Sequence, residues 1–318
     1  MTLFRRLLRN EWAGLAAIFI AGSVAASFIS PSFLTEYNIY VMLRSACVGL
    51  LVAFAQMIVL AVGQMNLAVG ALGGLVAVLF GAMLQLLGLP PVIAIPLALL
   101  IGIAGGLLNG LLTTRTGING FIITLASGSA FTGINLGITE GQAFHDIPAG
   151  FVAFGDSRWS FFPALLWPPL IVAPLLWVFL YRMKSGRRLL ATGGNLHAAE
   201  LSGIQTGAMV VLAHAISGGL AGLAAVLAVS QLGTAQPDIG SGWLLISFAG
   251  PIIGGTALAG GYVSIPGAVL AVLVIALIQN GLVLAKVDPY WVQFALGVLV
   301  LVTVGLNRWR ALRAERAK

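Results

Sequence analysis

The chain contains the stretch Arg182-Met-Lys-Ser-Gly-Arg-Arg-Leu-Leu-Ala-Thr-Gly-Gly-Asn-Leu-His-Ala-Ala-Glu-Leu-Ser-Gly-Ile204. It is the longest polar segment between the apolar runs that still has the pattern of a folded element. Four cations open it, and the pair Gly193-Gly194 predicts a turn. A short helix is expected to begin at Asn195, a residue type that caps helix N-termini, and to end at Gly203. On charge alone the segment is a solvated loop between two membrane spans. The small-residue helix with a defined start and end favours a docking element for a partner outside the bilayer.

The composition places the rest of the chain in a membrane. Of the 318 residues, 59% are hydrophobic and only 8% are charged, whereas soluble domains carry about 25% charged residues. The apolar runs are long and lack the alternating pattern of a barrel strand, so we expect an all-α, polytopic bundle surrounded by lipid. The net charge of +7 does not indicate nucleic acid, because the cations lie beside apolar spans. Cys47 is the only cysteine, which excludes a disulfide within the chain.

Ten apolar stretches are long enough to be membrane spans: 12–30, 39–62, 67–88, 92–114, 119–139, 161–181, 208–230, 243–262, 265–285 and 289–307. An even number places both termini on one side, which then holds 13 of the 16 cations, while six of the nine acids lie opposite. This asymmetry predicts that both termini are cytoplasmic. We expect residues 1–318 to form a single transmembrane domain, with a basic head (1–11), a cytoplasmic loop (182–207) and a basic tail (308–318).

A faint repeat relates the two halves of the chain. Gly106-Leu-Leu-Asn-Gly-Leu-Leu112 in the fourth span is similar to Leu277-Ile-Gln-Asn-Gly-Leu-Val283 in the ninth. These spans run in opposite directions, so spans two to five and seven to ten would form an inverted repeat, an arrangement common in transporters. A chance match in an apolar background is the alternative.

Each half also contains one glycine-interrupted segment, Gly63-Gln-Met-Asn-Leu-Ala-Val-Gly70 and Gly254-Gly-Thr-Ala-Leu-Ala-Gly-Gly261. Backbone that leaves a helix at membrane depth must face protein or a water-filled path, so the pair indicates a translocation pathway. Tight turns and small-residue packing explain the second segment equally well. Gln64 and Asn66 give the first segment an amide pair that lipid would not tolerate.

Uncharged polar side chains in and between the spans suit a neutral, polyhydroxylated solute better than an ion. The predicted pathway residues are Gln64, Asn66, Asn109, Thr124, Thr256, Gln279 and Asn280. Taken singly, each of them also fits a hydrogen bond between helices, worth about 0.6–2 kcal/mol.

The chain lacks groups that would let it supply its own energy. It has no Gly-x-x-x-x-Gly-Lys-[Ser/Thr] loop to hold a nucleotide. No carboxylate or lysine lies at mid-span to relay a proton or bind a cation. We expect no cofactor, no metal site and no catalysis by this chain, so that uphill transport would draw its energy from a partner.

Several blocks together resemble the ribose-type monosaccharide permeases of bacterial ABC importers. The segment Gly63–Gly70 resembles the family signature Gly-Gly-Ile-Asp-Leu-Ser-Val-Gly. The other blocks are Phe33-Leu-Thr-Glu-Tyr-Asn-Ile39, Gly106–Leu112 with Asn119-Gly-Phe-Ile-Ile-Thr-Leu125, Gly186-Arg-Arg188 to Gly194-Asn195 with Ala198-Ala199 and Ser202-Gly-Ile204, Ile253–Gly261, and Gln279-Asn-Gly-Leu282.

The resemblance implies a helical permease in the bacterial inner membrane that pairs with a second permease chain. It also implies two cytoplasmic ATP-hydrolysing subunits and a periplasmic sugar-binding protein. In this interpretation the ATPase binds residues 186–204. The coupling residues are Gly186, Arg187, Arg188, Asn195, Ala198, Ala199, Glu200, Gly203 and Ile204.

The chain departs from the signature at three positions, where Gln64, Asn66 and Ala68 replace glycine, aspartate and serine. These changes put the solute preference in doubt, or indicate one half of a heterodimer. A permease of the same type for nucleosides or branched-chain amino acids is one alternative. A stand-alone secondary carrier is another, although it predicts a membrane-embedded carboxylate that the sequence lacks. A membrane enzyme would have only His145 with Asp146 as a candidate pair.

Overall fold

The computed structural model of the chain describes residues 11–288 and the isolated positions 291, 294, 297, 298, 301 and 305. Apart from connecting loops and one short hairpin, this part is helical, which confirms the expected all-α class. The elements are α2 (Glu11–Ile29), α3 (Glu36–Ala61), α4 (Val69–Gln85), α5 (Pro91–Thr116), α6 (Gly120–Thr139), α7 (Ala149–Asp156), β1 (Arg158–Trp159), β2 (Phe162–Pro163), η1 (Ala164–Leu166), α8 (Trp167–Arg182), α9 (Lys184–Gly194), α10 (Leu196–Leu201), α11 (Thr206–Leu232), α12 (Trp243–Ile253) and α13 (Ile265–Leu284).

Seven of the described helices are long and apolar enough to cross a membrane: α2, α3, α5, α6, α8 (with η1), α11 and α13. The expected spans 67–88 and 243–262 correspond to shorter helices, α4 with 17 residues and α12 with 11. The tenth expected span, 289–307, lies outside the continuously described residues, as do residues 1–10 and the basic tail. The structure therefore confirms a polytopic helical chain and leaves the count of ten as a prediction.

Local sequence signals set the helix ends. The side chain of Thr35 accepts a hydrogen bond from the Asn38 amide at the start of α3, and Ser264 caps α13 in the same way. The helix α5 begins with Pro91 at its first position and ends before Gly117, whose φ of 70° is left-handed.

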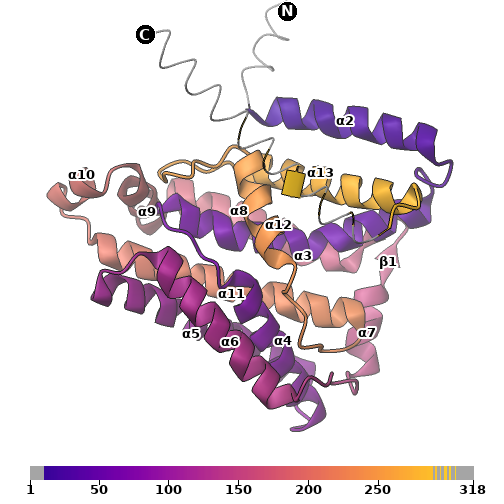
Figure 1. The fold of residues 1–318 in the computed structure, drawn as a ribbon, viewed down its shortest axis with the longest axis horizontal. Helices are drawn as coiled ribbons and strands as arrows, with labels where there is room; N and C mark the ends of the chain where they lie inside the picture. Colours follow the sequence, from indigo (N-terminus) through magenta and orange to yellow (C-terminus); the bar gives the residue numbers. More distant parts are fainter. Residues whose placement is uncertain are drawn as a thin grey trace, which may run out of the picture.

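The helices form a bundle in which α2, α13, α3, α11 and α5 run side by side across the view of Figure 1. The helices α9 and α10 gather at one end, here called the α9 end. The helix α7 and the hairpin lie at the opposite end, called the α7 end. Most of α3 is buried, so this helix forms the centre of the core.

The closest helix contact joins α5 to α11. Gly102, Gly106 and Gly110 of α5 face Gly218, the His214 carbonyl and Val211 of α11, and a Cβ added at these glycines would meet the facing backbone. Small residues spaced by four allow such close approach, which is how membrane helices gain van der Waals contact in place of a hydrophobic driving force. Close packing of α5 and α11 therefore depends on these glycines.

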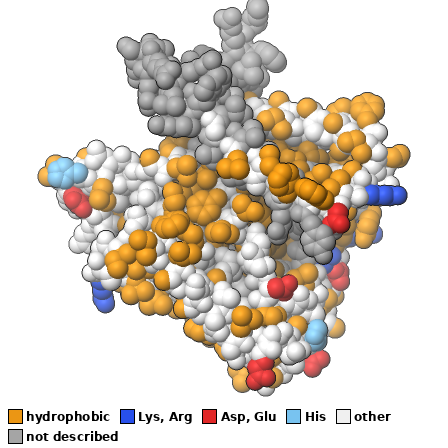
Figure 2. Space-filling view, in the orientation of Figure 1, with side chains coloured by type: hydrophobic (Ala, Val, Ile, Leu, Met, Phe, Trp, Pro, Cys, Tyr) orange, Lys and Arg blue, Asp and Glu red, His pale blue; other side chains and the backbone are white. Residues whose placement is uncertain are grey.

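Apolar side chains spread over most of the face in Figure 2, and the charged groups there are few. Exposed residues on α5 and α6 include Leu100, Ile122 and Leu125, at 51–59% exposure. A soluble protein rarely leaves so wide an apolar surface uncovered, so this surface suits lipid or another membrane chain.

The α7 end is closed by side-chain contacts between distant segments. The Arg44 guanidinium on α3 lies 2.6 Å from the Asp156 carboxylate and donates to the Gln231 carbonyl at 2.7 Å. The Ser230 hydroxyl donates to the Phe151 carbonyl at 2.8 Å. These contacts fasten α7 over the ends of α3 and α11.

The predicted turn at Gly193-Gly194 is wrong. Both glycines are the last residues of α9, and the chain turns at Asn195, whose backbone is extended. The glycines serve close packing rather than a turn, since a Cβ at Gly193 would collide with the neighbouring backbone described below. The predicted N-cap is confirmed, since the Asn195 side chain accepts from the Ala198 amide and α10 follows.

Candidate functional site

The first glycine-interrupted segment is a break between α3 and α4. The chain leaves α3 after Ala61, turns at Gly63 with a φ of 73°, and re-enters a helix at Val69. Asn66, at 1% exposure, holds this break in place. Its Oδ1 accepts from the Ala68 amide at 2.9 Å, and its Nδ2 donates to the Ser217 hydroxyl of α11 at 3.2 Å.

The backbone of the same break is satisfied by buried side chains on both sides. The Gln56 amide of α3 pairs with both the carbonyl and the N–H of Asn66, at 2.8 and 3.2 Å. The Thr124 hydroxyl of α6 accepts from the Leu67 amide at 3.0 Å and donates to the Gly120 carbonyl at 2.7 Å. Non-helical backbone is tolerated at membrane depth only with such partners.

Two more predicted residues lie near this break. A Cβ added at Gly120 would lie 2.6 Å from Gln64 Oε1 and 3.5 Å from Thr113, whose hydroxyl donates to the Asn109 carbonyl one turn away. Gln64 Oε1 and both amide atoms of Asn109 are buried without a hydrogen-bond partner among the described residues. The structure thus brings Gln64, Asn66 and Thr124 together, with Asn109 one helical turn beyond Thr113.

The other three predicted residues lie elsewhere. Asn280 on α13 forms a mutual amide pair with Asn38 on α3, at 2.8 and 2.9 Å. Gln279, its neighbour in sequence, is half-buried on the same helix. The Thr256 hydroxyl accepts from the Ser264 amide at 3.4 Å, within the turn between α12 and α13.

The second glycine-interrupted segment is that turn, and it lies at the α9 end. Three of its glycines, Gly255, Gly260 and Gly261, have φ angles of 87°, 92° and 82°. Such left-handed backbone is readily adopted by glycine alone, so α12 ends at Ile253. The sequence placed this segment late in a span, whereas the structure places it after the helix.

The end of α9 packs directly against both breaks. Gly261 donates its backbone N–H to the Ala61 carbonyl at 3.0 Å. A Cβ added at Gly193 would collide with that carbonyl and with the Gly261 nitrogen, and one at Gly260 would come within 2.6 Å of the Gly63 nitrogen. The predicted docking segment is therefore joined to both interrupted segments by backbone contact.

The rest of the α9–α10 segment protrudes from the bundle, and α10 forms the tip on the left of Figure 1. Gly186 is buried against α8, Ala199 is buried and Ile204 is half-buried, whereas Arg187, Arg188, Ala198 and Glu200 are exposed. Gly203 ends the segment with a φ of 76°, and Glu200 accepts from the Thr206 hydroxyl at 3.0 Å. Sequence reasoning missed Leu196 and Leu201, which are 54% and 78% exposed. The signal available in the sequence was a leucine near each end of the short predicted helix.

A third break, 233–242, joins α11 to α12 and was missed in the sequence. Gly233 and Gly240 have φ angles of 69° and 91°, and a Cβ at Gly240 would collide with the Gly70 carbonyl of α4. A cavity of about 230 Å³ lies beside this break. Its lining residues are Leu67, Gly70, Ala71, Gly74, Thr132, Asn135, Pro237, Ile239, Gly240, Ser241 and Leu244.

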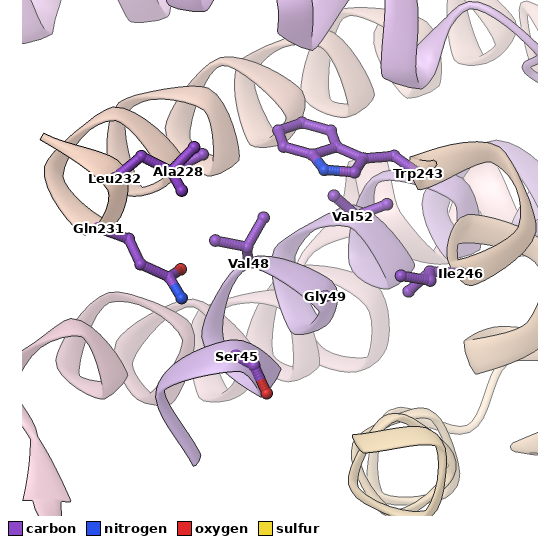
Figure 3. A pocket seen from close by; sticks show the side chains of 9 residues that line it. All are labelled: Ser45, Val48, Gly49, Val52, Ala228, Gln231, Leu232, Trp243 and Ile246. Atoms are coloured by element: carbon purple, nitrogen blue, oxygen red, sulfur yellow. The ribbon is translucent and has the colours of Figure 1, made fainter. Parts of the chain in front are cut away.

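A second cavity, of about 220 Å³, lies on the other side of the start of α12, between α3 and α11. Figure 3 shows the Trp243 indole at one side of it and the Gln231 amide at the other, with Val48 and Val52 between them. The Ser45 hydroxyl at its edge donates to the Met42 carbonyl at 2.8 Å. The walls of this cavity are mainly apolar.

Within the part of the chain that the structure describes, no three His, Cys, Asp or Glu residues gather as metal ligands would. Long apolar helices, glycine-rich breaks lined by uncharged polar groups and a protruding helix pair define a membrane permease.

The chain belongs to the family described as the permease component of the branched-chain amino acid transport system, whose model matches residues 37–304. The relatives of the chain confirm the resemblance to importer permeases that the sequence indicated. The chain is 35% identical to the ribose import permease of Bacillus subtilis over 90% of this chain and 89% of the relative. It is also 35% identical to the D-allose transport system permease of Escherichia coli, over 93% and 92%. A third relative is the autoinducer 2 import system permease of Yersinia enterocolitica, 31% identical over 96% and 93%.

The chain is therefore a transport permease and not an enzyme, and it is a multi-pass protein of the inner membrane. No solved structure matches it significantly.

Proposed function

We propose that this chain is the permease subunit of an ATP-binding-cassette importer and forms the translocation pathway for a monosaccharide. The observation that carries the proposal is the position of α9, whose end contacts both interrupted segments while α10 protrudes with Leu201 exposed. A displacement of α10 would be transmitted to both breaks through the backbone contacts of α9. The ribose and D-allose permeases among its relatives support a sugar as the solute.

The topology in this proposal has ten spans, with both termini and residues 182–207 in the cytoplasm. The excess of cations on that side supports it. An inverted repeat is supported by the order of elements, because a long helix, a glycine break and a shorter helix occur as α3–α4 and again as α11–α12. The helices that follow, α5 and α13, carry the two similar Asn-Gly blocks.

The proposed partners are a second permease chain, cytoplasmic ATPase subunits and a periplasmic sugar-binding protein. The ATPase would bind the exposed surface of α9 and α10, with the coupling residues named above. The wide apolar surface of the described bundle leaves room for a second chain as well as lipid.

In the pathway itself we assign the side chains different roles. Asn66 and Thr124 hold the first break in shape, since their polar atoms are occupied by protein partners. Gln64 and Asn109 keep buried polar atoms without partners among the described residues. These atoms are available to a solute hydroxyl. The Asn280 amide likewise holds α13 against α3 through its pair with Asn38, and Thr256 and Gln279, which lie apart from the first break, stay predicted residues of the pathway.

The description of the family favours a second candidate solute, a branched-chain amino acid. Such a solute carries both a positive and a negative charge, and the described pathway side chains are all uncharged. The neutral sugar therefore remains the first choice.

A tagged chain purified from its native membrane tests the proposal. We expect an ATPase and a solute-binding protein to co-purify, and the complex in liposomes to take up D-ribose or D-allose only with ATP. Uptake of leucine in place of either sugar would support the second candidate. Accumulation of solute by the chain alone, without an ATPase, would overturn the proposal.

A further inference from the structure

One residue that lines the cavity beside the third break has a buried polar atom without a hydrogen-bond partner among the described residues. Asn135 of α6 is only 3% exposed, and its Nδ2 donates to the Pro237 carbonyl at 2.9 Å. Its Oδ1 has no hydrogen-bond partner among the described residues. A buried acceptor without a partner is energetically costly, so a ligand that donates a hydrogen bond to this oxygen would remove that cost.

The walls of the cavity explain why Asn135 can lie there. A Cβ added at Gly74 of α4 would lie 3.3 Å from Asn135 Nδ2 and would collide with the Ile239 carbonyl. Because residue 74 has no Cβ, both the Asn135 amide and the backbone of the third break can pack against α4 at this position. Thr132 lies one turn from Asn135 along α6, and Ser241, an exposed residue of the third break, also lines the cavity.

We propose that this cavity is a solute-binding site for a small neutral polyol, with Asn135, Thr132 and Ser241 as its hydrogen-bonding groups. The Thr132 hydroxyl donates to the Gly128 carbonyl at 3.0 Å, so its oxygen remains an acceptor. The Ser241 hydroxyl can donate or accept. None of the lining residues is charged, and Leu67, Ile239 and Leu244 supply apolar surface for the ring of a sugar.

The volume of the site fits this class of ligand. The cavity of about 230 Å³ is smaller than the roughly 300–1,000 Å³ of pockets for drug-sized ligands. Its residues come from the first break, α4, α6, the third break and α12, so both halves of the chain contribute. The inference rests on the proposed function, since it names a place where the transported sugar is held.

Single cysteines test the site in the intact importer. Cys47 is the only native cysteine and is fully buried, so Thr132→Cys and Ser241→Cys each add one reactive thiol. We expect a thiol-reactive reagent to label both variants and to lower uptake at least fivefold. The transported sugar, D-ribose or D-allose, should slow the labelling by a similar factor. Ser45→Cys, in the second cavity, is the matched control and should label at the same rate with and without sugar.

A further variant removes one hydrogen-bonding group without disturbing the fold. Thr132→Val loses only a hydroxyl whose hydrogen bond goes to the Gly128 carbonyl of its own helix, so we expect the importer to assemble and its sugar uptake to fall roughly fivefold. If wild-type complex takes up neither sugar, the proposed function fails and this inference fails with it. If wild-type uptake is intact but sugar does not slow labelling at positions 132 and 241, the site alone is refuted.

Discussion

Asn66 stabilises the break between α3 and α4 through both the oxygen and the nitrogen of its side-chain amide. The sequence indicated an amide at membrane depth, and we interpreted it as a contact for solute. In the structure its oxygen and nitrogen are both occupied, by the Ala68 amide and the Ser217 hydroxyl. The identity of the residue was readable from the sequence, but its partner on α11 was not. Ser217 lies 151 positions along the chain, and nothing local marks that contact.

The Asn66–Ser217 contact can be measured by a double-mutant cycle. We expect Asn66→Ala to lower the free energy of unfolding by about 1–3 kcal/mol, because a buried hydroxyl and a backbone amide lose a partner. Combined with Ser217→Ala, the two losses should be less than additive by about 1 kcal/mol. Thermal unfolding of the purified chain in detergent gives both values.

The control pair is Asn66→Ala with Ser129→Ala, since Ser129 is an exposed residue of α6 whose hydroxyl bonds within its own helix. That pair should be additive. Additivity in the Ser217 pair as well would show that the contact contributes nothing to stability.

At the scale of the helix, the glycines have unequal roles that their number alone could not reveal. Gly106 lies where α5 crosses α11, and a Cβ there would collide with the His214 carbonyl. Gly137 of α6 has nothing within 4 Å of the same added atom. The sequence does not distinguish these two glycines, because the helix that crosses at Gly106 is set by tertiary structure.

Gly106→Ala and Gly137→Ala therefore form a matched pair with opposite expectations. The first should lower stability by about 1–3 kcal/mol, because the helices must separate to admit a methyl group. The second should be neutral or raise stability by up to about 1 kcal/mol, since alanine favours a helix. Melting temperatures of the two purified variants decide the matter, and equal shifts would contradict the packing described for α5 and α11.

The protruding helix α10 carries an expectation of its own. Leu201→Glu places a charge on a side chain that is 78% exposed, so the chain should insert and fold normally. If the ATPase docks there, solute-stimulated ATP hydrolysis should fall at least tenfold, because the charge would be buried without a partner. Glu200→Ala and Gly203→Ala should also reduce it.

Leu86→Glu is the control for this experiment. Leu86 is 67% exposed in the turn after α4, away from α9 and α10, and its replacement should leave stimulated hydrolysis unchanged. Wild-type rates in all the α10 variants would argue against docking at this helix.

For the whole molecule, hydrophobic runs predicted where most helices lie, because each apolar span is specified by its own residues. The described helices α2, α3, α5, α6, α8, α11 and α13 fall on expected spans. Local patterns failed where long-range packing decides. The helix α12 is shorter than its apolar run, because glycines at 255, 260 and 261 turn the chain toward α9. The third break and its cavity were missed because they depend on the packing of Gly240 against Gly70, which is distant in the sequence.

We propose that α10 is the cytoplasmic docking helix through which a separate ATPase drives this permease. The most direct test is the labelling of Leu201→Cys by a membrane-impermeant maleimide, with buried Cys47 as the unreactive background. The account predicts labelling in inverted inner-membrane vesicles but not in intact spheroplasts, and protection when the co-purifying ATPase is bound. Labelling from the outside of spheroplasts would contradict it.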